Sequence, residues 1–163
     1  MNFVNKKELD AIYDAVYKTK NIDWNQVTEL VRNLTDINGF VDNEDSTLSY
    51  FFDSWLDTRK AVELTKLFLE NGFDVNGNDG FNGTSCLKKL CWSGYHGYIL
   101  DVAELLLDAG SKWDYIDPAD DEKYTVLDEV GGRTIEWGVG DFDSANLYEA
   151  YYLMVKRYSE SKP

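Results

Sequence analysis

Residues that perform most enzymatic and metal chemistry are scarce in this chain. Its 163 residues include one histidine and two cysteines. His96 is accompanied by no H-x-x-x-H, C-x-x-C or nucleophile-elbow pattern that could hold zinc or activate a nucleophile. Cys86 and Cys91 lie on one expected helix and point in different directions, which disfavours a disulfide. We therefore expect no catalytic residue, no metal and no cofactor, and a protein that is not an enzyme.

Positive charge is also in short supply. Sixteen Lys and Arg residues face thirty Asp and Glu residues, which leaves a formal net charge of −14. Such a chain repels phosphate backbones and anionic lipid but attracts a basic protein surface. We expect a basic protein partner and no direct binding of nucleic acid.

Long apolar runs are missing as well. No window approaches the roughly 18 apolar residues of a membrane span, and the first residues, Met1–Lys7, lack the apolar run of a secretory signal. We expect no membrane partner and a cytoplasmic location. A calcium loop is not expected at Asp74–Gly80 either, because its glycine comes one position late and its twelfth position is Ser85 instead of a glutamate.

Apolar residues are nevertheless plentiful enough for a folded core. Hydrophobic residues make up 44% of the chain and aromatic residues 15%, which predicts a single folded domain over residues 1–163. Within it, Leu67–Gly72 and Leu105–Gly110 read almost as copies, and each ends in a glycine. Repetition of this kind is typical of stacked helical pairs, which usually bind macromolecules.

Helical periodicity and end signals place the individual helices. Apolar residues recur at helical spacing in each segment, and Asp23 and Thr58 stand where N-caps are expected. Gly72 and Gly110 can end helices in the left-handed conformation. The expected helices are Lys6–Lys18, Trp24–Leu34, an aromatic helix over Tyr50–Leu56, one capped by Thr58 and ending at Gly72, one in the unit that starts at Gly83–Leu87 and ending near Gly94, one over Leu100–Leu107 and a last one over Ser144–Tyr158.

Several of these segments resemble the ankyrin repeat. Gly83–Leu87 and Thr125–Asp128 stand where its G-x-T-P-L-H motif would fall, Leu67–Leu69 and Leu105–Leu107 match its apolar L-L-L run, and Gly72–Asn76 matches its closing G-A-D-V-N. The prolines and histidines of the first motif are absent, and the spacing between matching segments exceeds the family's period of roughly 33 residues. An unrelated array of helical pairs or an irregular bundle is the competing interpretation.

The resemblance implies an all-α fold, an ankyrin-like solenoid of about four helix-turn-helix units with irregular terminal caps. The expected units span residues 6–44, 45–79, 80–119 and 120–160. In the family, the first helices and the hairpin tips form a concave face. Because acidic connectors precede successive units, stacking would align them along one edge, next to acidic and aromatic residues of the first helices. The expected partner-binding residues are Asp42, Glu44, Asp45, Asp53, Asp57, Asn78, Asp79, Phe81, Trp92, Tyr95, Asp120, Asp121, Glu122, Asp128 and Glu129.

These features predict a non-enzymatic interaction module that binds a basic protein through an acidic concave face. A small, strongly acidic chain, with the Asn, Lys and Tyr content typical of an AT-rich bacterial genome, also fits an immunity protein that neutralises a basic toxin. Two alternatives stay open. One is a nucleic-acid mimic that inhibits a DNA-binding protein, and the other is a small hydrolase that uses Asp or Glu together with His96. The oligomeric state is not predicted.

Overall fold

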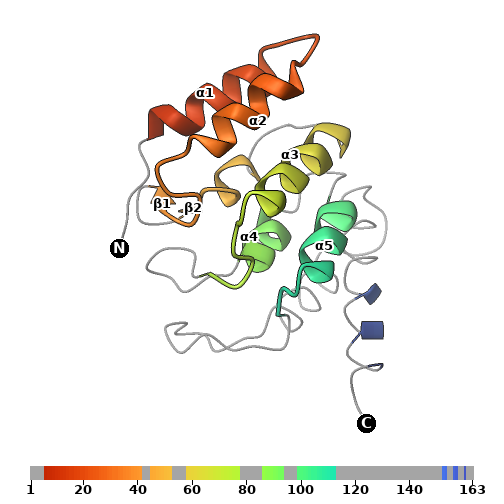
Figure 1. Ribbon diagram of the computed structural model, residues 1–163. Helices are drawn as coiled ribbons and strands as arrows, with labels where there is room; N and C mark the ends of the chain where they lie inside the picture. Colours follow the sequence, from red (N-terminus) through yellow and green to blue (C-terminus); the bar gives the residue numbers. More distant parts are fainter. Residues whose placement is uncertain are drawn as a thin grey trace.

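The computed structural model describes residues 6–41, 45–52, 58–77, 86–93 and 99–112, together with 152–153, 156–157 and 160. This part of the chain is predominantly helical, as expected (Figure 1). None of its helices has the length and apolar character that crossing a membrane requires. Its elements are α1 (Lys6–Tyr17), α2 (Trp24–Arg32), β1 (Phe40–Val41), β2 (Asp45–Ser46), the 3-10 helix η1 (Ser49–Phe51), α3 (Thr58–Glu70), α4 (Cys86–Ser93) and α5 (Ile99–Asp108).

The first two helices form as the sequence predicts. In α1, Leu9, Ile12 and Val16 are buried on one stripe, which is the spacing of an amphipathic helix. The carboxylate of Asp23 caps α2 by accepting hydrogen bonds from the backbone N–H groups of residues 25 and 26, at 3.1 and 3.3 Å. The two helices pack against each other as a hairpin.

A short hairpin then leads into the next unit. Strands β1 and β2 pair antiparallel, with Val41 opposite Asp45. Ser46 and Ser49 share a 2.8 Å hydroxyl hydrogen bond, and the hydroxyl of Thr47 donates to the carbonyl of Ile37. The helix expected over Tyr50–Leu56 is, within the described residues, only the single 3-10 turn η1. The side-chain and backbone bonds around Ser46 hold this tighter turn.

Helices α3 and α5 end in the same way, as their matching glycines predict. Gly72 and Gly110 adopt left-handed backbone conformations, with φ of 92° and 95°. At each end, the glycine N–H donates to the carbonyl three positions back and the next N–H along the chain donates to the carbonyl five positions back, which is the Schellman pattern. One expected boundary is off by a single position, because Thr58 begins α3 instead of preceding it as the cap.

The first unit ends differently because it has no glycine at this position. Leu34 occupies the place that Gly72 and Gly110 take in the later units, and its Cβ, which glycine lacks, disfavours the left-handed conformation. The bond that a Schellman turn would give to Thr35 is supplied from α1 instead. Oε1 of Glu8 accepts hydrogen bonds from the Thr35 N–H at 3.1 Å and from its hydroxyl at 2.8 Å.

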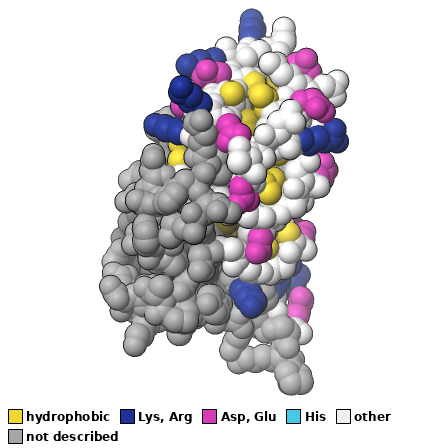
Figure 2. All heavy atoms as spheres, turned by 60° about the vertical axis from the view of Figure 1, so that its left-hand side comes forward, with side chains coloured by type: hydrophobic (Ala, Val, Ile, Leu, Met, Phe, Trp, Pro, Cys, Tyr) yellow, Lys and Arg dark blue, Asp and Glu magenta, His cyan; other side chains and the backbone are white. Residues whose placement is uncertain are grey.

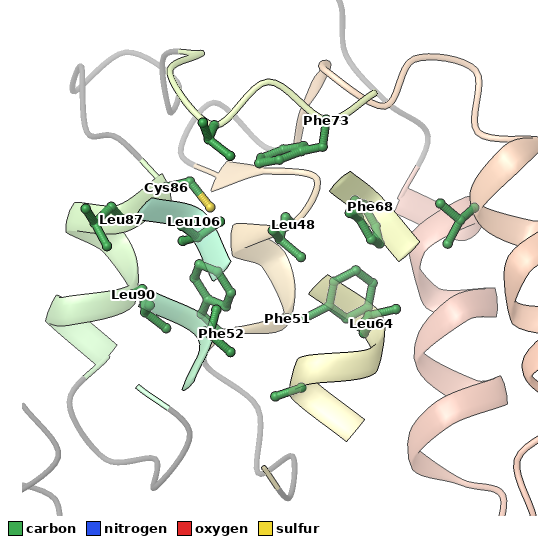
Figure 3. Close-up of a cluster of buried hydrophobic side chains, with 14 of the residues drawn as sticks. Leu48, Phe51, Phe52, Leu64, Phe68, Phe73, Cys86, Leu87, Leu90 and Leu106 are labelled. Carbon is green, nitrogen blue, oxygen red and sulfur yellow. The ribbon is translucent and has the colours of Figure 1, made fainter. Parts of the chain in front are cut away.

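The hydrophobic core runs continuously through the described units. Figure 3 shows that the neighbouring residues Phe51 and Phe52 point to opposite sides. Phe51 contacts Phe68 of α3 edge-to-face at a ring distance of 5.9 Å. Phe52 points toward Leu90 of α4 and Leu106 of α5 (Figure 3). The core therefore joins the units through η1.

Helix packing arranges these units in two layers. Helix α3 packs against both α2 and α5, so the second helices of the units lie side by side (Figure 1). Turn η1 packs against α4, and two tyrosine hydrogen bonds join α1 to η1. Within the described part of the chain, α1, η1 and α4 thus form the other layer. The expected fourth unit, from 120 to 160, lies almost entirely outside the described residues.

Candidate protein-docking surface

Two asparagines link the loops that follow the second helices. The side-chain amide of Asn38 donates to the carbonyl of Gly72 at 3.1 Å and accepts from the N–H of Asp74 at 2.7 Å. In the next loop, the amide of Asn76 donates to the carbonyl of Gly110 and accepts from the N–H of Lys112, both at 2.9 Å. We call these two sets of bonds the asparagine ladder. Each rung joins a loop to the equivalent loop of the next unit.

The local turns of the ladder repeat as well. Oδ1 of Asp36 accepts from the N–H of Asn38 at 2.9 Å, and Oδ1 of Asp74 accepts from the N–H of Asn76 at the same distance. The sequence signal is the repeated Asp-x-Asn-Gly at 36–39 and 74–77, which sequence reasoning did not use. The loops at 36–39, 74–77 and 110–112 therefore lie next to one another in that order. In the third of these loops the charge is reversed, because Lys112 stands where the first two loops have Asp36 and Asp74.

A second feature lies on α1, beside the next unit. Asp10, Tyr13, Asp14 and Tyr17 occur at the spacing of one helix face, next to the buried stripe. The two tyrosine rings stack at a centroid distance of 4.2 Å and an interplanar angle of 11°. Together with Tyr50 of η1, these residues define what we call the acid-aromatic face. All of them are half-buried except Asp14, which is exposed.

Hydrogen bonds hold this face in place across the unit boundary. The hydroxyl of Tyr50 donates to Oδ1 of Asp10 at 2.6 Å, and the hydroxyl of Tyr17 donates to the carbonyl of Phe51 at 3.5 Å. Lys18 lies 2.9 Å from the carboxylate of Asp14. This hydrogen bond and the charge of Asp14 raise the pKa of Lys18 above its ordinary value. This face was not predicted from the sequence, because helical periodicity alone counts Tyr13 and Tyr17 with the apolar residues of α1.

Charge is distributed unevenly over the second-helix layer. Ion pairs are formed within α2, between Arg32 and Glu29, and within α3, between Lys66 and Glu63. Helix α5 has no basic residue, and its three acidic residues, Asp101, Glu104 and Asp108, are all exposed. Asp108 pairs with Arg157. On the face shown in Figure 2, acidic side chains extend along the middle, whereas Lys and Arg gather toward the upper and lower ends.

Most residues expected to bind the partner lie outside the described part of the chain. For Asp45 and Trp92 only the placement in β2 and α4 is described. Nothing in the structure bears on the other expected residues or on His96. The residues outside the described ranges are Asp42, Glu44, Asp53, Asp57, Asn78, Asp79, Phe81, Tyr95, Asp120, Asp121, Glu122, Asp128 and Glu129.

The described residues offer no metal site. No three His, Cys, Asp or Glu side chains within them come together so that they could hold a metal ion. At the loop that superficially resembles a calcium site, the Asn76 amide is used by the ladder, and the Asp74 carboxylate accepts a bond from its own turn. Cys86 is buried in the core, 1% exposed, as expected for a packing residue.

Comparison with known proteins adds no relative. No protein-family model matches the sequence, and no curated protein gives a match.

Proposed function

We propose that this chain is a non-enzymatic protein-protein interaction module, built as a divergent ankyrin-like stack, that binds a basic protein. The observation that carries the proposal is the asparagine ladder. It repeats with the same period as Gly72 and Gly110 and joins successive units by the same pairs of backbone atoms. Stacks of this kind present an extended surface made by many units, which suits binding of a macromolecule.

The proposed docking surface combines the acid-aromatic face with the acidic connectors. Aromatic rings beside carboxylates suit arginine, because the ring face attracts the guanidinium while the carboxylate pairs with it. The bond from Tyr50 holds the Asp10 carboxylate in one orientation before any partner arrives. The connectors at Asp42–Asp45, Asn78–Asp79 and Asp120–Glu122 would add long-range attraction, in keeping with the net charge of −14.

Within this class, the finer proposal is an immunity protein that neutralises a basic bacterial toxin such as a nuclease. Small size and strong acidity support it, because an acidic inhibitor is steered quickly to a basic target. Identification of the partner as a toxin would decide whether the chain is an immunity protein.

The proposal can be tested by finding the partner and mapping where it binds. The full chain is immobilised, proteins captured from lysate at low salt are identified by mass spectrometry, and the main captured protein is purified for titration. We expect a basic protein whose affinity falls as salt rises. Capture of neutral or acidic proteins only, or an affinity that salt leaves unchanged, would contradict the proposal.

Variants then locate the surface. Replacing Asp10 by Asn together with Tyr13 by Ala should weaken binding about tenfold or more, since buried aromatic and charged contacts carry much of the energy of an interface. Charge reversal of Asp120, Asp121 and Glu122 should weaken binding and change its salt dependence. The matched control is Asp101→Asn with Glu104→Gln on the exposed side of α5, for which we expect little change. Equal losses in the control would place the partner elsewhere.

The two alternatives predict different outcomes. A nucleic-acid mimic should lose its captured partner when duplex DNA is added as competitor. A hydrolase should lose its activity in the His96→Ala variant, whereas an interaction module should bind unchanged unless His96 lies in the interface.

A further inference from the structure

Both asparagines of the ladder are followed directly by glycine, as Asn38-Gly39 and Asn76-Gly77. Glycine has no side chain to hinder approach to its own backbone nitrogen. An asparagine in this position therefore meets little steric resistance when that nitrogen attacks its side-chain amide. Both asparagines are exposed to solvent.

We propose that Asn38 and Asn76 are sites of spontaneous deamidation whose rate is set by how often neighbouring units separate. In the first step, the backbone nitrogen of the glycine attacks Cγ of the asparagine, a new C–N bond forms, and the Cγ–Nδ2 bond breaks. Nδ2 leaves as ammonia and takes up the proton that the glycine nitrogen loses. Water then opens the resulting succinimide ring at either carbonyl, which yields aspartate or isoaspartate. The only other reactant is water.

In the stacked state, hydrogen bonds oppose each part of this step. The Asn38 amide is engaged at both its nitrogen and its oxygen by the next unit, at 3.1 and 2.7 Å. The attacking nitrogen, that of Gly39, donates to the carbonyl of Asp36 at 3.1 Å. At the second rung, the amide is held at 2.9 Å on both sides, and the N–H of Gly77 donates to Asp74 at 3.2 Å. Reaction requires the bonds between the asparagine amide and the next unit to break, so it proceeds from the state in which the two units have separated.

Deamidation would weaken the ladder permanently. A carboxylate can still accept the bond from the Asp74 or Lys112 N–H, but it has no N–H to donate to the Gly72 or Gly110 carbonyl. It also places a negative charge at the carbonyl end of α3 or α5, where the helix dipole disfavours an anion. Isoaspartate adds a backbone atom to a tight turn. Each product therefore favours separation of the two units that the rung joins.

Asn71-Gly72 provides an internal comparison within the same chain. The Asn71 amide donates to the carbonyl of Leu67 at 2.7 Å, which lies in its own helix and not in the next unit. Opening between the units that the second rung joins should therefore release Asn76 but leave Asn71 protected. Asn38, at the other rung, should also keep its protection.

The test measures deamidation of the full chain at each site by peptide mapping after incubation at neutral pH. We expect Asn38 and Asn76 to react at least about tenfold more slowly in the folded chain than in urea-unfolded chain, a ratio that reports the opening equilibrium. The Leu106→Ala variant, weakened in α5, should accelerate Asn76 more than Asn38 or Asn71. Equal rates in folded and unfolded chain would overturn the proposal, as would equal acceleration at all three sites.

A second measurement does not depend on the variant folding. The unsubstituted chain is incubated in urea below its unfolding transition, and the deamidated fraction is then separated by anion exchange. We expect Asn76 and Asn38 to accelerate in this urea before Asn71 does. The separated fraction should unfold at lower urea than the parent, and unchanged unfolding would contradict the proposed role of the ladder.

Discussion

Replacing Asn76 by Asp tests the ladder with almost no change in side-chain size. The variant keeps the oxygen that accepts from the Lys112 N–H at 2.9 Å but loses the amide hydrogen that is donated to the Gly110 carbonyl. One lost hydrogen bond costs about 0.5 to 1.5 kcal/mol net. The new carboxylate also lies at the C-terminal end of α5, which adds about 0.3 to 1 kcal/mol. We therefore expect the free energy of unfolding to fall by about 1 to 2.5 kcal/mol.

The assay is urea unfolding followed by circular dichroism and tryptophan fluorescence. Asn33→Asp is a matched control. Asn33 is exposed at the C-cap of α2 and does not belong to the ladder, so its replacement introduces the same charge at a helix end without removing a rung. It should show only the dipole contribution. If Asn76→Asp is no more destabilising than Asn33→Asp, the reasoning that the rung stabilises the stack is refuted. Asn38→Asp should behave like Asn76→Asp, since its bonds are equivalent.

Substitutions at three further sites test the core, a helix end and the first unit. Leu106→Ala removes a side chain that is 0% exposed and should lower the free energy of unfolding by about 2 to 5 kcal/mol; a change within about 0.5 kcal/mol would mean that the α5 face is misassigned. Gly110→Ala should lower the free energy of unfolding by about 1 to 2 kcal/mol. The cost comes from backbone strain alone, because a Cβ at this position would have no atom within 4 Å. Gly110→Asn should lower the free energy of unfolding less, since asparagine tolerates the left-handed conformation better, and urea unfolding compares the two variants. Glu8→Ala removes the acceptor of both Thr35 hydrogen bonds and should lower the free energy of unfolding by about 1 kcal/mol in thermal or urea unfolding. The control, Glu29→Ala, removes an exposed carboxylate and should lower it by less than about 0.5 kcal/mol. Equal effects of the two substitutions would contradict the role of Glu8 in capping the end of α2.

The features predicted best from sequence are those governed by nearby residues. Asp23 caps α2 because the N–H groups it binds lie two and three positions ahead, and Gly72 and Gly110 end their helices because left-handed backbone strongly favours glycine. The helix expected over Tyr50–Leu56 begins instead, within the described residues, as a 3-10 turn at Ser49–Phe51, and the part of that prediction beyond Phe52 lies outside the described ranges. Apolar spacing alone does not register the Ser46 bonds that hold this turn.

Features that join distant residues were not predicted. The ladder bonds span 34 and 36 positions, and the Tyr50–Asp10 bond spans 40. No local preference indicates such pairs, although the repeated Asp-x-Asn-Gly could have indicated the ladder. The expected binding residues remain predictions, since nearly all of them lie outside the described ranges. Fold class was therefore easier to predict than the docking surface, because helices depend on local pattern and a surface depends on how units are placed.

The opposed phenylalanines of η1 have a consequence for how the chain unfolds. Phe51 and Phe52 are adjacent in sequence but belong to contacts with different helices, so moving one backbone segment disturbs both contacts. Loss of order on either side of η1 is then transmitted to the other. We expect η1 and the helices that contact Phe51 and Phe52 to unfold together in one cooperative step. Local unfolding should begin in α1 and α2, which lie farther from these two side chains (Figure 3).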